Sequence, residues 1–157
     1  MSAPNASRDR HWIAGHIPHD GAMSLLERVA AWDTQRIHCQ ALSHRAADNP
    51  LRAGGRLGSA CGIEYAAQAM AVHGALLAVA GATPRRGYIA SVRGVELLAE
   101  RLDEAGDTLD IVAERLSGDD NLLLYAFDVS ADGRCLVRGR AAVVLDAERL
   151  ATASRQP

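Results

Sequence analysis

The chain of 157 residues contains no lysine, because all 17 of its basic residues are arginine. Schiff-base chemistry, a phosphate-loop lysine and a lysine general base are therefore excluded. Cysteine is scarce as well: Cys39, Cys61 and Cys135 are odd in number and form no C-x-x-C pair. We therefore expect a reduced, cytoplasmic protein. The net charge of −2 argues against a nucleic-acid-binding protein that depends on bulk positive charge.

Length and composition predict one folded domain. Hydrophobic residues make up 48% of the chain, which argues against disorder of the whole chain, and 157 residues suffice for a single buried core. The first eleven residues have no apolar segment of the kind that a signal peptide carries. We expect a single domain over residues 12–146, with flexible tails at 1–11 and 147–157.

One long apolar stretch, residues 57–81, is the centre of the expected fold. Its spacing of apolar residues predicts a helix over residues 62–80. Apolar or small residues lie on nearly all faces of this helix, so we expect it to be buried. Glu64 is its only charged residue, and burial of an unpaired carboxylate is costly, which makes Glu64 a candidate for function. Because Gln68 and His73 also lie in the stretch, we expect a core helix and no membrane span.

Most of the other ordered segments alternate apolar and polar residues, which is typical of strands. Because a sheet must cover its apolar face, the simplest arrangement is an α+β fold in which a curved antiparallel sheet wraps around one long buried helix. Pairing with a second copy would hide the edge of such a sheet. The expected elements are a turn at 16–21, a short helix at 22–29, a loop at 47–58, and strands at 36–42, 87–92, 95–98, 108–116, 122–130 and 134–145.

Two sequence motifs carry a family resemblance. Residues 17–29, I-P-H-D-G-A-M-S-L-L-E-R-V, resemble the pattern P-H-x-x-x-M-x-L-L-x-R-V, and residues 62–71, G-I-E-Y-A-A-Q-A-M-A, resemble G-x-E-Y-x-A-Q. In this order and spacing they resemble the hotdog-fold 3-hydroxyacyl-(acyl carrier protein) dehydratases, especially the branch linked to aryl-polyene-type pigments. The resemblance covers residues 13–146 and implies the hotdog fold.

The resemblance also implies site residues and an assembly. His19 matches the catalytic histidine of the family, Glu64 matches its catalytic acidic residue, and Gln68 matches a supporting glutamine. The family builds each site across a dimer, with the histidine from one chain and the carboxylate from the other. It needs no cofactor, and it acts on 3-hydroxyacyl groups held on acyl carrier protein. We therefore expect a homodimer, or a heterodimer with a paralogue.

The chemistry of dehydration suits these residue types. Removal of the C2 proton needs a base that works near neutral pH, for which histidine is the usual choice. Glu64 would protonate the leaving hydroxyl. Backbone N–H groups at the start of the Gly62 helix would hold the thioester oxygen, and Gly58 and Ser59 would bring the backbone close to it. The sequence differs from the housekeeping dehydratases at 19–23 and at 58–59, where they have His-Arg-Tyr-Pro-Phe and Pro-Gly.

Several alternatives stay open at this point. An acyl thioesterase of the same fold would use Glu64 to activate water, and a non-catalytic hotdog subunit would bind acyl carrier protein without turnover. Cys61 lies at a helix start, where a thiolate is stabilised, yet we interpret it as a small apolar filler. His11, His16, His19 and Asp20 match no known metal-ligand spacing, so we expect no metal. Arg85 and Arg86 form either a solvated turn or a docking patch for an acidic carrier protein.

Overall fold

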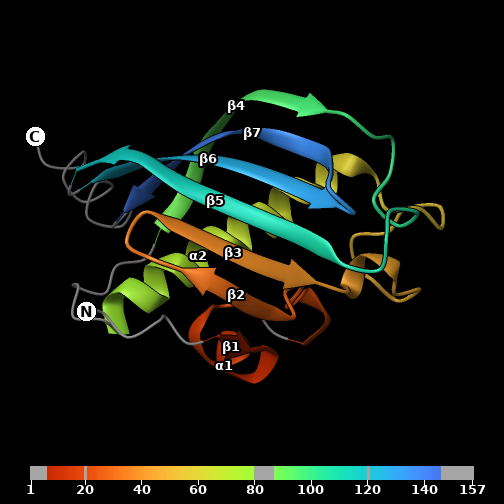
Figure 1. The fold of residues 1–157 in the computed structure, drawn as a ribbon, viewed down its shortest axis with the longest axis horizontal. Helices are drawn as coiled ribbons and strands as arrows, with labels where there is room; N and C mark the ends of the chain where they lie inside the picture. Colours follow the sequence, from red (N-terminus) through yellow and green to blue (C-terminus); the bar gives the residue numbers. More distant parts are fainter. Residues whose placement is uncertain (1–6, 20, 80–86, 120, 146–157) are drawn as a thin grey trace, which may run out of the picture.

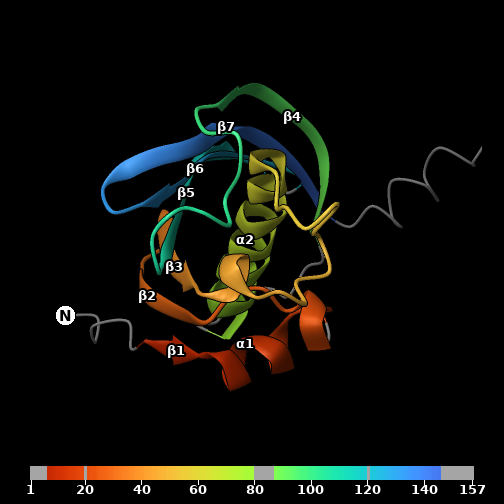
Figure 2. The same cartoon turned by 90° about the vertical axis from the view of Figure 1, so that its right-hand side faces the viewer.

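A single antiparallel sheet of the described residues curves around one long helix (Figures 1 and 2). The computed structural model describes residues 7–19, 21–79, 87–119 and 121–145. Seven strands lie in the order β1-β2-β3-β5-β6-β7-β4, and every neighbouring pair is antiparallel. The elements are β1 Arg8–Asp9, α1 Arg10–His16, η1 Gly21–Met23, β2 Arg28–Trp32, β3 Arg36–Ala41, η2 Ser43–Arg45, η3 Ser59–Cys61, α2 Gly62–Val79, β4 Gly87–Leu97, β5 Leu109–Gly118, β6 Leu122–Ala131 and β7 Arg134–Leu145. This architecture confirms the predicted hotdog fold.

The central helix α2 lies in the concave face of the sheet, as Figure 2 shows. Its prediction is confirmed from Gly62 to Val79, and the expected final residue, Ala80, is outside the described residues. A Cβ atom at Gly62 would lie 3.1 Å from Cγ2 of Val137 on β7, so glycine lets the start of the helix approach the sheet closely. The first turn of α2 is therefore held against β7, and this placement sets where Glu64 lies.

The four strands after the helix agree with the prediction, with one difference. Two strands were expected at 87–92 and 95–98, but β4 is continuous from Gly87 to Leu97. Gly94 has a φ of +59° at a bulge between Arg93 and Glu96, so the glycine bends the strand without ending it. No membrane-spanning helix occurs among the described residues.

Two predictions for the first 29 residues were wrong. The expected helix at 22–29 is absent, because Arg28 and the following residues pair with β3 as strand β2, and only Gly21–Met23 form a short 3₁₀ turn. Tertiary pairing here overrides a local helical pattern. Folded structure also begins before residue 12. Asp9 caps helix α1 by accepting a hydrogen bond of 2.9 Å from the backbone N–H of Trp12, and β1 pairs with β2.

A buried polar pair ties α2 to the sheet on the far side from the expected site. His73 Nδ1 lies 2.7 Å from the Tyr125 hydroxyl, and His73 Nε2 lies 2.7 Å from the carbonyl oxygen of Asp33. A carbonyl only accepts, so Nε2 carries the proton and Nδ1 accepts from the hydroxyl. Burial lowers the pKa of His73 and raises the pKa of Tyr125 to about 12. Both groups are therefore neutral in the folded protein at neutral pH.

The protein is expected to lose stability in mild acid because of His73. Its folded-state pKa lies below the value near 6.5 that it has in the unfolded chain, so the unfolded state takes up the proton first. The stabilisation is complete above pH 6.5 and is lost as the pH falls below it, by up to about 1 kcal/mol at pH 5.5. Urea unfolding at pH 7.5 and 5.5 measures this loss. His73→Gln should reduce this pH dependence, and the buried His44, whose pKa burial also lowers, should account for part of what remains.

Candidate active site

The two residues expected to be catalytic lie in contact within one chain. His19 Nε2 is 3.1 Å from Glu64 Oε1, and the two side chains are 27% and 34% exposed. The two groups lie in contact within a single chain, so a site within one chain is the alternative to the expected site across two chains, which stays a prediction. His19 Nδ1 is buried without a hydrogen-bond partner in the described residues. Nε2 is thus the ring nitrogen placed to exchange a proton with Glu64.

Gln68 holds this pair in place. Its Nε2 donates to Glu64 Oε1 at 3.2 Å and to the carbonyl oxygen of Met23 at 2.8 Å, while its Oε1 accepts from the backbone N–H of Leu25 at 3.0 Å. One buried amide thus joins the helix that carries Glu64 to the segment that follows His19. The supporting role in catalysis that the resemblance implies for Gln68 stays a prediction.

The backbone before α2 is arranged differently from the expectation. The N–H groups of Ser59, Cys61 and Gly62 donate to the carbonyl oxygens of Glu100, Gly58 and Ser59, respectively. Of these three donors, only Gly62 belongs to the helix start whose N–H groups were expected to hold a thioester oxygen, and its N–H is already engaged within η3. The reason is local, since η3 extends the helix backwards by one turn and satisfies groups that a bare helix start leaves unpaired. These three N–H groups cannot hold a substrate oxygen without breaking those bonds.

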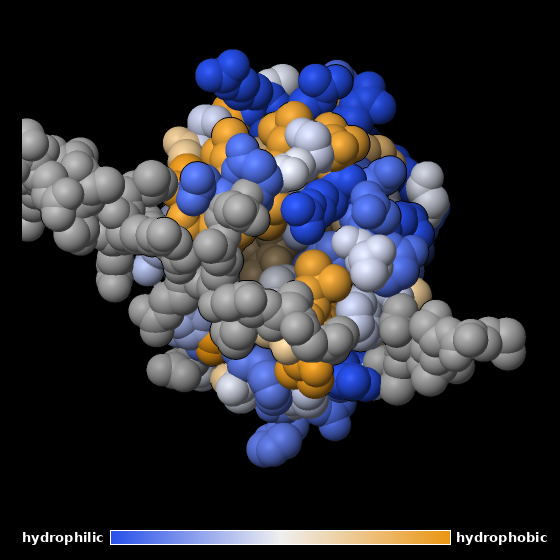
Figure 3. Space-filling view, turned by 90° about the vertical axis from the view of Figure 1, so that its left-hand side faces the viewer, coloured by the Kyte–Doolittle hydropathy of each residue, from blue (hydrophilic) through white to orange (hydrophobic). Residues whose placement is uncertain are grey.

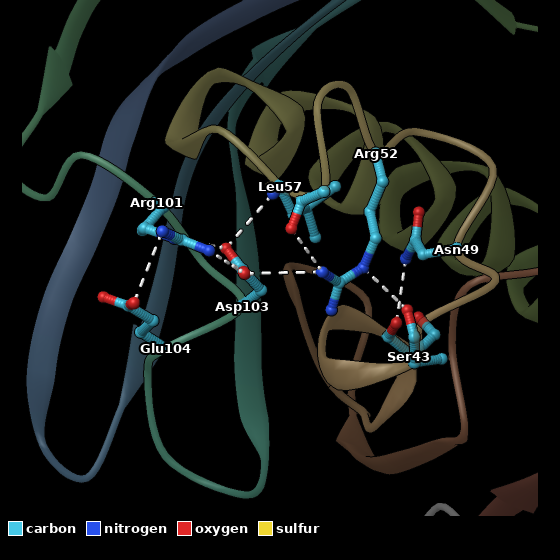
Figure 4. A network of polar contacts seen from close by, with 9 residues as sticks. Ser43, Asn49, Arg52, Leu57, Arg101, Asp103 and Glu104 are labelled. Atoms are coloured by element: carbon cyan, nitrogen blue, oxygen red, sulfur yellow. Dashed lines mark hydrogen bonds and ion pairs between the residues drawn. The ribbon is translucent and has the colours of Figure 1, made fainter.

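A buried carboxylate fixes the loop that leads into η3 (Figure 4). Asp103, whose side chain is 6% exposed, accepts from the backbone N–H of Leu57 at 3.1 Å and pairs with the guanidinium groups of Arg101 and Arg52. The Arg101 guanidinium beside it holds the pKa of Asp103 well below its usual range, and the Leu57 N–H adds to this effect. The loop at 47–58 is thereby fastened to the segment after β4, although residues 57 and 103 are far apart in the sequence.

An open groove borders the same segment. Ser59, Leu97, Leu98, Ala99 and Glu100 line it, and its volume is about 420 Å³. Leu97 and Leu98 are 52% and 43% exposed, which gives the groove an apolar wall. It lies beside η3, directly before the first turn of α2.

Hydrophobic and hydrophilic side chains mix at the opposite end of α2, on the face that Figure 3 shows. Val79 ends α2, Leu116 lies near the end of β5 and Leu122 begins β6, and all three side chains are about half exposed. Val79 lies 15 residues after Glu64, so about 22 Å of helix separates this end from the His19–Glu64 pair. The expected docking residues Arg85 and Arg86 are outside the described residues.

The alternative chemistries receive little support from the geometry. Burial raises the pKa of the Cys61 thiol, whose sulfur lies 3.9 Å from the carbonyl oxygen of Leu51, so the thiol stays protonated. This agrees with the interpretation of Cys61 as a filler. In the described part of the chain, which omits Asp20, no three potential metal ligands cluster closely enough to hold an ion.

A curved sheet around a buried helix, with an imidazole against a carboxylate in the first turn of that helix, defines a hotdog-fold protein with a candidate acid–base pair. The chain belongs to the ApeP-like family of ApeP dehydratases, whose family model matches residues 12–153. Membership of this family classes the chain with dehydratases and confirms the predicted resemblance. No curated protein matches the chain significantly.

Solved structures confirm the fold. The dehydratase heterocomplex ApeI:P from Xenorhabdus doucetiae contains a chain that is 23% identical with a TM-score of 0.76, and the match covers 99% of this chain and 100% of that one. A thioesterase from Pseudomonas aeruginosa is 14% identical with a TM-score of 0.61, covering 92% and 98%. The PaaI protein of E. coli is 12% identical with a TM-score of 0.60, covering 86% and 88%. At these identities the likeness shows the fold alone, and the reaction must be inferred from the residues of the site.

Proposed function

We propose that this protein dehydrates 3-hydroxyacyl thioesters carried on acyl carrier protein to trans-2-enoyl thioesters, in polyene or fatty-acid-like synthesis. The observation that carries the proposal is the contact of 3.1 Å between His19 Nε2 and Glu64 Oε1 at the start of a buried helix. An imidazole and a carboxylate supply the general base and general acid that this elimination needs. Membership of the ApeP-like dehydratases supports the same reaction class.

His19 and Glu64 together account for every proton that the proposed reaction moves. Neutral His19 takes the C2 proton on Nε2 while protonated Glu64 gives its proton to the C3 hydroxyl, which leaves as water as the C2–C3 double bond forms. The pair is then an imidazolium and a carboxylate. The proton returns from Nε2 to Oε1 across the contact of 3.1 Å, and this transfer restores both groups for the next turnover. Gln68 keeps Glu64 within reach by donating to the same carboxylate oxygen.

Mass spectrometry of a 3-hydroxyacyl carrier protein incubated with the enzyme tests the proposal. The acyl group should lose the mass of one water. Release of the free acid would instead identify a thioesterase, and an unchanged substrate would favour a non-catalytic subunit that binds acyl carrier protein. Docking of the acidic carrier at Arg85 and Arg86 stays a prediction, because both residues are outside the described part of the chain.

The sheet edge at β4 supports a dimeric assembly. Among the described strands, β4 pairs only with β7, so one side of its eleven residues has no partner strand. The opposite edge of the sheet ends in β1, which has two residues. A long unpaired edge is a template for another strand. We therefore infer that β4 pairs with a second copy or with a hotdog paralogue, as the name of the ApeI:P heterocomplex suggests for that relative.

The purified protein is expected to be a homodimer in solution. Its mass by light scattering should be about twice the 16.7 kDa of one chain at micromolar concentration, because strand pairing at β4 buries backbone groups that otherwise need water. A monomer mass would contradict the homodimer and leave only the pairing with a paralogue, which co-expression and the same measurement would then detect.

A further inference from the structure

The hydroxyl group of Tyr65 lies at the centre of a buried polar cluster beside the active site. Tyr65 follows Glu64 on α2, and its side chain is fully buried. Its hydroxyl lies 2.8 Å from Ser43 Oγ and accepts from Asn49 Nδ2 at 3.1 Å. Ser43 Oγ lies 2.8 Å from the carbonyl oxygen of Leu25, and Asn49 Nδ2 also donates to the carbonyl oxygen of Ser43 at 2.8 Å.

The direction of each hydrogen bond follows from the donors available. The carbonyl of Leu25 only accepts, so the single hydroxyl hydrogen of Ser43 points to it. The Tyr65 hydroxyl must then donate to Ser43 Oγ and accept from Asn49. Asn49 Oδ1 accepts from the backbone N–H of Leu51 at 2.9 Å, which fixes the orientation of the amide. Each polar atom in the cluster therefore has a partner, and the cluster has one arrangement.

This cluster and Gln68 hold the same short segment from two sides. Gln68 binds the carbonyl of Met23 and the N–H of Leu25, while Ser43, held by Tyr65, binds the carbonyl of Leu25. The segment 23–25 makes these bonds with side chains because it lies outside the strands. His19 lies four residues before Met23. The position of His19 relative to α2 therefore depends on how firmly this segment is held.

We propose that Tyr65 is a positioning residue that acts through Ser43 and the Leu25 peptide to set the contact between His19 and Glu64. The proposal rests on the proposed function, in which that contact carries the proton transfers. Burial raises the pKa of Tyr65, so its hydroxyl keeps the proton that it donates to Ser43. Without the Tyr65 hydroxyl, Ser43 can rotate, the buried carbonyl of Leu25 loses a fixed donor, and the segment that leads to His19 loosens.

Tyr65→Phe tests the proposal, and Tyr125→Phe is its matched control. Both changes remove a buried tyrosine hydroxyl, but that of Tyr125 contacts His73, far from the pair. Tyr65→Phe should lower kcat about tenfold with KM within about twofold, since small displacements of catalytic groups are costly. Tyr125→Phe should lower the melting temperature at least as much and leave kcat unchanged. Ser43→Ala should lose as much kcat as Tyr65→Phe, and the double variant should be no worse, because both residues act on one carbonyl.

A readout that needs no turnover separates this proposal from the proposed function. The ¹⁵N resonance of His19 Nε2, assigned with Glu64→Gln, should shift in Tyr65→Phe and stay unchanged in Tyr125→Phe. If the wild type has no dehydratase activity but the His19 resonance still shifts in Tyr65→Phe, the proposed function is defeated and the positioning role is supported. An active wild type in which Tyr65→Phe alters neither kcat nor the resonance would overturn the positioning role. Equal losses of kcat in both tyrosine variants would also overturn it.

Discussion

Mixing the inactive variants His19→Ala and Glu64→Gln is expected to restore no activity. Each variant alone should lose about 10²-fold or more in turnover, which is the usual contribution of a general acid or base. The two groups lie 3.1 Å apart in the same chain, so every mixed dimer contains two damaged sites. Because the residues act in one proton cycle, the double variant should be little worse than either single variant.

Subunit exchange must be shown before this result is interpreted. Differently tagged variants, purified through both tags, supply mixed dimers of defined composition. Dimers of wild type with the double variant should keep one intact site if each site lies within one chain, and none if each site spans two chains. A site built across two chains would leave one site intact in each mixed dimer and return about a quarter of the wild-type activity to a fully exchanged mixture. That result would show that the contact within one chain is not the catalytic arrangement and would leave the roles of His19 and Glu64 in place.

Much of the fold could be predicted because its signals are local and strong. Apolar residues recur with a helical period in the stretch that becomes α2. They alternate with polar residues in the segments that become β5, β6 and β7. Strand β2 could not be predicted in this way, since its identity depends on pairing with β3 and its sequence also fits a helix. The cap at Asp9 was a readable signal for α1, but the polar residues around it favoured a tail.

The candidate site was predictable only in part. A solitary carboxylate in a buried helix pointed to Glu64, and the family motif added His19 and Gln68. The contact between His19 and Glu64 within one chain could not be read from the sequence, because it depends on the path of the segment 19–25. Tyr65 belongs to the motif, but its role could not be predicted, because its hydrogen-bond partners lie 16 and 22 residues away in the sequence. The hydrogen bond of the Ser59 N–H likewise depends on a tertiary contact, with the carbonyl oxygen of Glu100.

Asp103→Ala is expected to cause a large loss of stability. The carboxylate of Asp103 is buried and accepts hydrogen bonds from Arg101 and from the backbone N–H of Leu57, with Arg52 at 3.5 Å. Its removal leaves the Arg52 guanidinium without this counter-charge, leaves Arg101 with only the exposed Glu104, and leaves one N–H without an acceptor, at a cost of about 3 kcal/mol. Because the folded-state pKa of Asp103 is held low, its stabilisation is complete at neutral pH and is lost only in strong acid.

Glu104→Ala is the matched control for this loss. Glu104 also pairs with Arg101, at 3.3 Å, but its side chain is 69% exposed, so the free energy of unfolding should change by less than about 0.5 kcal/mol. Thermal unfolding should show a melting temperature about 6–12 °C lower for Asp103→Ala and almost no change for Glu104→Ala. Equal melting temperatures for the two variants would show that the buried carboxylate does not hold this loop.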